Sequence, residues 1–193
     1  MKIDIDARGL ACPQPVIYTK KALDSIQAGT VITVVDNLVA KDNVSKLAQS
    51  LGCEYTVAEE AGLFTLTITK GTDAAEVSVQ TPADGAVVFI TQEGLGNGSE
   101  ELGKILMKSF FFTLVESNQA PKTVMFANGG VKLACAGSVV IDHLQLLAEQ
   151  GTEILSCGTC LDFFNLKEQL QVGQITNMYT ILENLKQGQV IKL

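Results

Sequence analysis

The hydrophobic pattern changes character near the middle of the chain, and this change constrains the fold more than any other feature. In the first part the apolar residues of the expected strands alternate with polar ones, as Phe64, Leu66 and Ile68 alternate with threonines. Alternation is typical of a strand with one face on a core and the other in water. In the second part, segments 86–90 and 123–127 are nearly continuous apolar runs, typical of strands buried on both faces. The chain is therefore expected to fold as two α/β domains with different kinds of sheet.

Domain boundaries follow from the same pattern. The first domain is predicted over residues 1–70 and the second over residues 86–193, with residues 71–85 as a linker because they are rich in Thr, Asp, Ser, Pro and Gly. The first domain is predicted as a two-layer β-α-β-α-β-β sandwich. Its elements are expected over residues 3–6, 13–25, 30–35, 40–51, 54–59 and 63–69. The second domain is predicted as a three-layer, mostly parallel open sheet. Its strands are expected over residues 86–90, 123–127 and 152–156, and its helices over residues 99–116, 139–150 and 177–186.

The composition disfavours several classes of protein. The chain has 193 residues, 47% of them hydrophobic, which suffices for sizeable cores. A net charge of −7 and the lack of any Lys/Arg cluster argue against a nucleic-acid partner. No apolar run approaches the roughly 20 residues of a membrane span, and the N-terminus lacks a signal-peptide core, so we expect a cytoplasmic protein. In that reducing compartment the five cysteines are expected to be reactive, metal-bound or buried rather than paired in structural disulfides.

Cys12 is the first candidate for chemistry. It precedes Pro13 and Pro15 at the predicted start of an amphipathic helix, where proline is well tolerated. This position at or near the N-cap should offer free backbone N–H groups and the positive end of the helix dipole, both of which favour a thiolate. A thiolate is the nucleophile needed to accept sulfur from a persulfide donor. The alternative is a small buried cysteine with no chemical role.

The ten residues from Asp6 to Pro15, DARGLACPQP, resemble the signature of the TusA/SirA-like sulfur-carrier family. The resemblance covers roughly residues 1–70 and implies that Cys12 carries a persulfide and passes its sulfur to a partner. It also implies a sulfur or selenium donor protein, such as a cysteine desulfurase, and an acceptor protein whose identity stays open. The residues that the motif implies in support are Asp6, Arg8, Gly9, Pro13 and Pro15.

A second thiol pair, Cys157 and Cys160, follows the third apolar strand of the second domain. Open α/β sheets carry their ligands and chemistry at this edge, where Cys135 is also expected. The pair could be a redox pair, half a zinc site, or a nucleophile with a bystander. A structural zinc site takes four ligands, and Cys135 and His143 supply no second pair, so we expect neither a metal nor a cofactor. The remaining alternative is that both thiols are packing residues beside Phe163.

The second domain, from about residue 86 to the C-terminus, resembles the DsrE/DsrF-like family more loosely. This resemblance implies a parallel α/β sheet, homo-oligomers and an active Cys157, with Cys160 able to close an internal disulfide as a resolving step. A TusA-like domain followed by a DsrE-like domain is similar to the YedF-like family named for selenium metabolism. The expected function is a sulfur or selenium carrier that relays a persulfide or perselenide through Cys12 and Cys157. The alternatives are a thiol–disulfide oxidoreductase using Cys157 and Cys160, and a non-catalytic adaptor.

Two further segments have structural interpretations. The glycine-rich loop over residues 94–98 could bind phosphate at a helix start, but its spacing does not fit a dinucleotide-binding motif, and Asn97 with Glu100 is expected as a capping box. Three consecutive phenylalanines over residues 110–112 cannot all face one core. Part of this run is therefore expected at an interface between copies of the chain.

Overall fold

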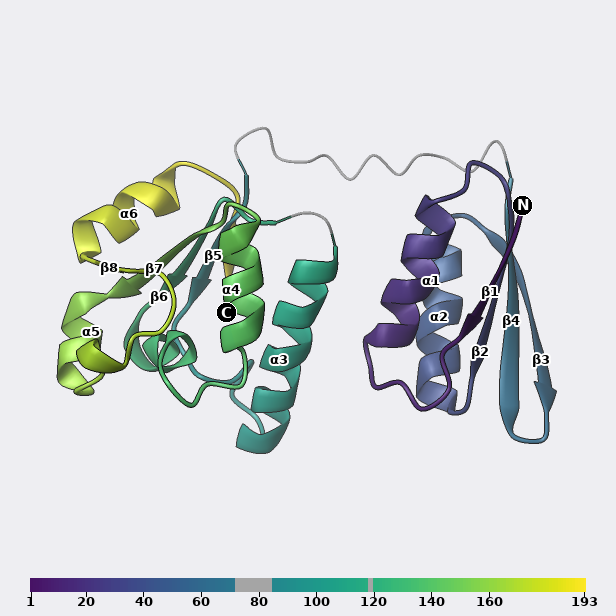
Figure 1. Ribbon diagram of the computed structural model, residues 1–193, viewed down its shortest axis with the longest axis horizontal. Helices are drawn as coiled ribbons and strands as arrows, with labels where there is room; N and C mark the ends of the chain where they lie inside the picture. Colours follow the sequence, from purple (N-terminus) through teal and green to yellow (C-terminus); the bar gives the residue numbers. More distant parts are fainter. Residues whose placement is uncertain (72–84, 118–119) are drawn as a thin grey trace. The chain divides into compact units, whose positions relative to one another are not determined.

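A computed structural model describes residues 1–71, 85–117 and 120–193, and the chain forms two compact units, Met1–Val79 and Gln80–Leu193 (Figure 1). Both are α/β units, which confirms the fold class predicted from the sequence. The predicted linker, residues 71–85, lies outside the described residues apart from its two end positions. The domain boundaries given above therefore stay predictions.

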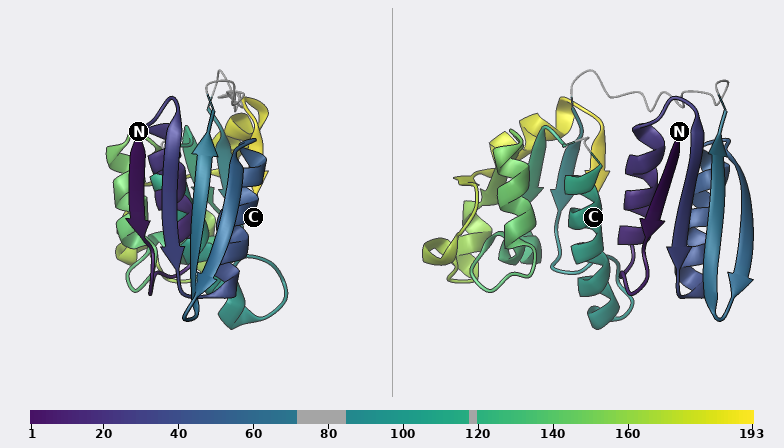
Figure 2. Two further views of the ribbon diagram at one scale, coloured as in Figure 1. Left: turned by 90° about the vertical axis from the view of Figure 1, so that its right-hand side faces the viewer. Right: turned by 45° about the vertical axis from the view of Figure 1, so that its right-hand side comes forward.

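The first unit is a two-layer sandwich of one four-stranded sheet and two helices. Its elements are β1 Lys2–Asp6, α1 Gln14–Asp24, β2 Gly29–Val35, α2 Leu38–Ser50, β3 Glu54–Glu60 and β4 Leu63–Lys70. The strand order is β1-β2-β4-β3, in which β1 and β2 are parallel and the other neighbours are antiparallel. Both helices cover the same face of the sheet, and the other face is open (Figures 1 and 2). The predicted element order and the two layers are confirmed.

The core of the first unit lies between the helices and the inner face of the sheet. Phe64, Leu66 and Ile68 are buried, as their alternation predicts. On α1 the buried side includes the polar residue Thr19. Its hydroxyl lies 2.7 Å from the carbonyl of Pro15, to which it donates, and 2.9 Å from the hydroxyl of Thr33. These bonds satisfy a polar group that would otherwise be costly to bury.

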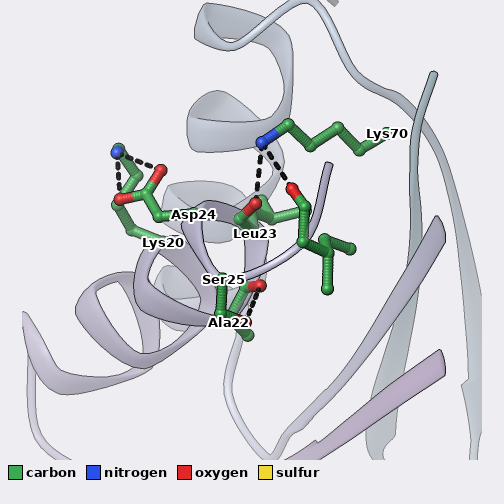
Figure 3. A network of polar contacts seen from close by, with 7 residues as sticks. Lys20, Ala22, Leu23, Asp24, Ser25 and Lys70 are labelled. Carbon is green, nitrogen blue, oxygen red and sulfur yellow. Dashed lines mark hydrogen bonds and ion pairs between the residues drawn. The ribbon is translucent and has the colours of Figure 1, made fainter. Parts of the chain in front are cut away.

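The C-terminal end of α1 is held by a lysine from the end of β4 (Figure 3). The ammonium of Lys70 donates to the carbonyls of Leu23 and Ile26 at 2.8 and 2.9 Å. These carbonyls lack helical partners, and a cation near them also complements the helix dipole. The exposed Lys20–Asp24 ion pair lies on the same turn and adds little. Lys70 thus fixes α1 at the end far from Cys12.

The second unit is built on a five-stranded sheet. Its elements are β5 Val87–Ile90, α3 Glu100–Glu116, β6 Thr123–Phe126, η1 Asn128–Ala134, α4 Ile141–Glu149, β7 Glu153–Cys157, α5 Gly158–Phe163, η2 Lys167–Gln169, β8 Gln174–Thr176, α6 Met178–Lys186 and β9 Val190–Lys192, where η marks a 3₁₀ helix. The strand order is β8-β7-β6-β5-β9, and every pair is parallel. The predicted parallel sheet is confirmed.

Three layers follow from the direction of the crossovers. From β5 to β6 and from β6 to β7, each new strand is added at the same edge of the sheet. Because parallel crossovers are right-handed, the connecting helices α3 and α4 lie on one face. The step from β8 to β9 runs the other way, so α6 lies on the opposite face (Figure 1). The central strands are covered on both faces, and all four residues of β6 are buried.

Several predicted boundaries are corrected. The strand expected over residues 152–156 covers Glu153–Cys157, because the backbone N–H of Thr152 donates to the Leu147 carbonyl at the end of α4, at 3.0 Å. The short elements α5, β8 and β9 were not predicted, because three to six residues carry too little periodicity. The predicted cap of α3 is wrong: the side chain of Ser99, not of Asn97, accepts the N–H of Leu102.

The phenylalanine run divides between core and periphery. Phe111 is fully buried, Phe110 packs edge-on against it, and Phe112 packs edge-on against His143. An interface between copies therefore cannot use Phe111.

Among the helices in the described part of the chain, none has both the length and the apolar character that a membrane crossing requires.

Candidate functional site

The first site is formed where two parallel strands end side by side. The last residue of β1, Asp6, pairs with Val34 near the end of β2, and the N–H of Ala7 continues the ladder to the Val34 carbonyl at 2.8 Å. The loop after β1 leads to Cys12, and the loop after β2 leads into α2. The parallel pairing therefore brings the start of α1 and the start of α2 together.

A network of charged groups shapes the loop between Asp6 and Cys12. Arg8 donates from Nε and from a terminal nitrogen to the two Asp6 oxygens at 2.8 and 2.6 Å, a bidentate geometry. The N–H of Gly9 donates to Asp36 at 2.7 Å. Gly9 has φ 71°, which glycine adopts without the strain that a side chain would add. The Asp-Ala-Arg-Gly part of the motif thus fixes the path of the chain toward Cys12.

These contacts also set the ionisation of the carboxyl groups. The hydrogen bonds from the side chain and backbone of Arg8 lower the pKa of Asp6 from 3.8 to about 2. The pKa of Asp36 is also lowered, chiefly by the hydrogen bond from the N–H of Gly9. Both carboxylates are ionised at neutral pH, so the network is fully formed there.

Cys12 is exposed and lies immediately before α1. The N-cap is Pro13, so Cys12 lies one residue before it, and Pro15 is buried in the first turn. The first turn has only two backbone N–H groups, because Pro13 and Pro15 have none. The sequence predicted that these groups are free to contact the thiol, and this prediction is wrong. The N–H of Gln14 donates to the Ala11 carbonyl at 2.9 Å and that of Val16 to the Pro13 carbonyl at 3.1 Å.

A side chain from α2 approaches the thiol instead. Asn43 Nδ2 lies 3.8 Å from Cys12 Sγ and donates to it. Asn37 lines the same small pocket, of about 30 Å³, but its side chain is engaged elsewhere: it accepts the N–H of Ala40 as the cap of α2 and donates to Asp36. The residues around this pocket are Leu10, Cys12, Pro15, Val16, Asn37, Val39, Ala40 and Asn43.

Sequence reasoning missed Asn43. Its only local signal is its place one residue before the buried Val44 on α2, which puts it at the border of the buried face. Its partner is 31 positions earlier, and only the pairing of β1 with β2 brings the two together.

The second site combines Cys157 and Cys160. Cys157 is the last residue of β7, occupies the N-cap position of α5 and is only 2% exposed, whereas Cys160 is partly exposed. The backbone N–H of Asn128, at the start of η1, donates to Cys160 Sγ at 3.1 Å. Burial and a hydrogen bond with the Cys157 thiol raise the pKa of Cys160, and the Asn128 amide acts in the opposite direction. The helix α5, which begins directly after Cys157, was not predicted from the sequence.

The remaining cysteines have surroundings that fit packing. Cys135 is 1% exposed, and its thiol donates to the Val131 carbonyl at 3.2 Å, with burial raising its pKa. Burial likewise raises the pKa of Cys53, which is also buried. Within residues 1–71, 85–117 and 120–193, no three His, Cys, Asp or Glu side chains gather as a metal site would require.

The first part of this chain is similar to known proteins. Residues 3–70 match the family described as sulfurtransferase TusA. The chain is 34% identical over 65 residues to the candidate sulfur carrier protein YrkI of Bacillus subtilis. This match covers 32% of this chain and 87% of YrkI. It is 38% identical over 63 residues to the candidate sulfur carrier protein YrkF of the same organism, covering 31% of this chain and 33% of YrkF. The match thus spans about a third of the length of YrkF.

One solved structure is similar in sequence to part of this chain. The SirA-like protein of Desulfitobacterium hafniense is 36% identical, and the match covers 37% of this chain and 99% of that protein with a TM-score of 0.35.

The Asp6–Arg8 contact predicts an unusual titration. The carboxyl carbon of Asp6, followed by NMR, should titrate with a midpoint near pH 2 in the native chain. The contact of the ionised Asp6 carboxylate with Arg8 stabilises the fold fully above pH 3.8, the ordinary pKa of the group. This stabilisation is lost as the pH falls through about 2, because the protonated carboxyl group no longer accepts both hydrogen bonds of Arg8. In Arg8→Gln the midpoint should rise toward 3.8. An unchanged midpoint in that variant would contradict the assigned cause.

The Asn43 contact predicts slower chemistry at Cys12 when the donor is removed. In Asn43→Asp, alkylation of Cys12 by iodoacetamide at pH 7.5 should slow by about two- to tenfold, the equivalent of one hydrogen bond of about 0.5–1.5 kcal/mol. The new carboxylate would also repel a thiolate. Gln49→Glu makes the same amide-to-carboxylate change on α2, where Gln49 donates to Tyr55 instead. Equal slowing in both variants would show a general charge effect rather than the contact.

Proposed function

We propose, from the premise that the chain belongs to the sulfurtransferase TusA family through residues 3–70, that it carries sulfur as a persulfide on Cys12. The observation that carries this proposal is the exposed Cys12 thiol, held beside the Asn43 amide at the end of a loop fixed by Asp6, Arg8 and Gly9. Asp6, Arg8 and Gly9 support the thiol by fixing the path of the loop that leads to it, and they do not contact its sulfur.

The proposed loading step is an exchange without net oxidation. The Cys12 thiolate attacks the outer sulfur of a donor persulfide, the sulfur–sulfur bond of the donor breaks, and the donor leaves as a thiolate. Delivery to an acceptor is the same exchange with Cys12 as the donor. The relatives are named as sulfur carriers, and a cysteine desulfurase is the proposed donor.

The pocket beside Cys12 supports carriage of one added atom. A volume of about 30 Å³ accommodates a group the size of a water molecule, and a single sulfur atom is of that size. The Asn43 amide is a neutral donor, so it can contact either a thiol sulfur or a charged terminal sulfur. Selenium forms the same bonds at the same sites, and the sequence resemblance to the YedF-like family motivates a perselenide as the alternative cargo.

The second thiol pair is proposed to take part in the relay, with Cys157 and Cys160 handling the same cargo. A separate function, thiol–disulfide exchange at this pair, is favoured by one observation: Cys157 and Cys160 lie three residues apart on the first turn of α5, where their side chains share one side of the helix. The relay needs only a nucleophilic thiolate, because persulfide transfer involves no net oxidation, whereas thiol–disulfide exchange needs the pair to be redox-active.

Sulfur loading tests the proposed carrier directly. Incubation of the full chain with a cysteine desulfurase and cysteine should add the mass of one sulfur atom to the peptide that contains Cys12, and the addition should be absent in Cys12→Ser. Cys53→Ser is the matched control, because Cys53 belongs to the same unit and is buried. Loading of the Cys12→Ser chain at the wild-type level in its first unit would contradict the assignment.

The expected homo-oligomer is proposed to use the outer side of α3. Leu102, Ile105 and Leu106 are apolar and exposed there, with Ile105 56% exposed, whereas Phe111 faces the core. Sedimentation of the full chain at micromolar concentration should show a dimer or trimer that Ile105→Glu converts to a monomer. Lys108→Glu, an exposed change on the same helix, should leave the oligomer intact. A wild-type monomer would contradict the proposal.

A further inference from the structure

The thiols of Cys157 and Cys160 differ in access, and this difference bears on how they act. Cys157 is 2% exposed at the end of a central strand, while Cys160 is partly exposed on the first turn of α5. A nucleophile that takes sulfur from another molecule must meet the donor sulfur in line, so the donor can reach Cys160 before it can reach Cys157.

Backbone contacts fix the geometry of the pair. The N–H of Asn128 points at Cys160 Sγ from 3.1 Å, a donor that favours negative charge on that sulfur. Gly158 lies between β7 and the body of α5, and a Cβ at this position would lie 2.9 Å from a methyl group of Ile175. The glycine therefore lets α5 begin close against β8, which keeps Cys160 beside Cys157.

We propose that Cys160 and Cys157 form a persulfide-reducing dithiol in which Cys160 accepts the sulfur and Cys157 releases it. This reverses the roles that the sequence resemblance suggests. It goes beyond sulfur carriage on Cys12, because a carrier only passes sulfur on, whereas this pair would reduce it. The substrate class is a persulfide, on a small thiol or on a protein.

The steps balance in atoms and electrons. Cys160 thiolate attacks the outer sulfur of the donor persulfide, forming a persulfide on Cys160 while the donor leaves as a thiolate. Cys157 then attacks the inner sulfur, which is Cys160 Sγ, and the outer sulfur leaves as hydrosulfide with the proton of Cys157. The two thiols are oxidised to a disulfide, and the transferred sulfur is reduced to sulfide. A dithiol reductant is the class of co-reactant that would return the pair to its reduced form.

The spacing of the two thiols supports the second step. Cys157 at the N-cap of α5 and Cys160 three residues later lie on the same side of one helical turn, so only a small movement is needed to bring the two sulfurs into bonding contact. The alternative is that both sulfurs only fill space, since Cys157 belongs to the core cluster of this unit and Cys160 packs against it.

The test is one turnover of the full chain with cysteine persulfide and no reductant, followed by intact mass, peptide mapping and sulfide trapping. The wild-type chain should release one equivalent of sulfide and form the Cys157–Cys160 disulfide. Cys157→Ser should keep one added sulfur on Cys160 and lose the sulfide burst. Cys160→Ser should show neither the burst nor a sulfur on Cys157. Cys135→Ser, a buried thiol of the same unit, is the matched control and should behave as wild type.

The outcomes that overturn the proposal are distinct. An added sulfur on Cys157 in Cys160→Ser would show that the roles are reversed, and a wild-type chain that releases no sulfide would show that the pair only packs. Circular dichroism of each variant before the reaction shows that it is folded. The Cys12→Ser chain should keep the burst, so failure of carriage on Cys12 and failure of the dithiol can be told apart.

Discussion

The parallel pairing of β1 with β2 is the constraint on which the first site depends. Because the two strands run the same way, their carboxyl ends meet, and the loops that follow them converge. One loop brings Cys12, and the other brings Asp36 and the start of α2 with Asn43. An antiparallel pairing would place these loops at opposite ends of the sheet. The Asp6–Arg8 contact and the Gly9 turn then determine how the Cys12 loop leaves the strand.

The second unit uses the same arrangement with different groups. β6 and β7 are parallel neighbours, and the segments after them bring Asn128 and Cys160 into contact. In both units a sulfur atom thus receives an N–H from the segment that follows an adjacent parallel strand. The donors differ: a side-chain amide reaches Cys12, whereas a backbone amide reaches Cys160. Substitution of Asn43 therefore removes the donor to Cys12, whereas substitution of Asn128 leaves its backbone N–H in place.

Much of the fold could be predicted because its signals are periodic. The alternation of Phe64, Leu66 and Ile68 determines which face of β4 is buried, and the apolar run of β6 requires cover on both faces. The cysteine motif could also be found, since Cys12 and its prolines are contiguous. What escaped prediction depends on contacts between distant segments. Asn43 and the Asn128 amide touch their sulfurs across 31 and 32 positions, and the start of α5 after Cys157 depends on how Gly158 packs against β8.

The central claim is that Cys12 holds the cargo in the working protein. The most direct measurement is the mass of the Cys12 peptide from chain purified from its own cells, with all thiols and persulfides capped by an alkylating agent at lysis. The account predicts that part of this peptide carries one extra sulfur or selenium atom between Cys12 and the cap. A Cys12 peptide carrying the cap alone, while the extra atom is found on another cysteine of the same sample, would contradict it.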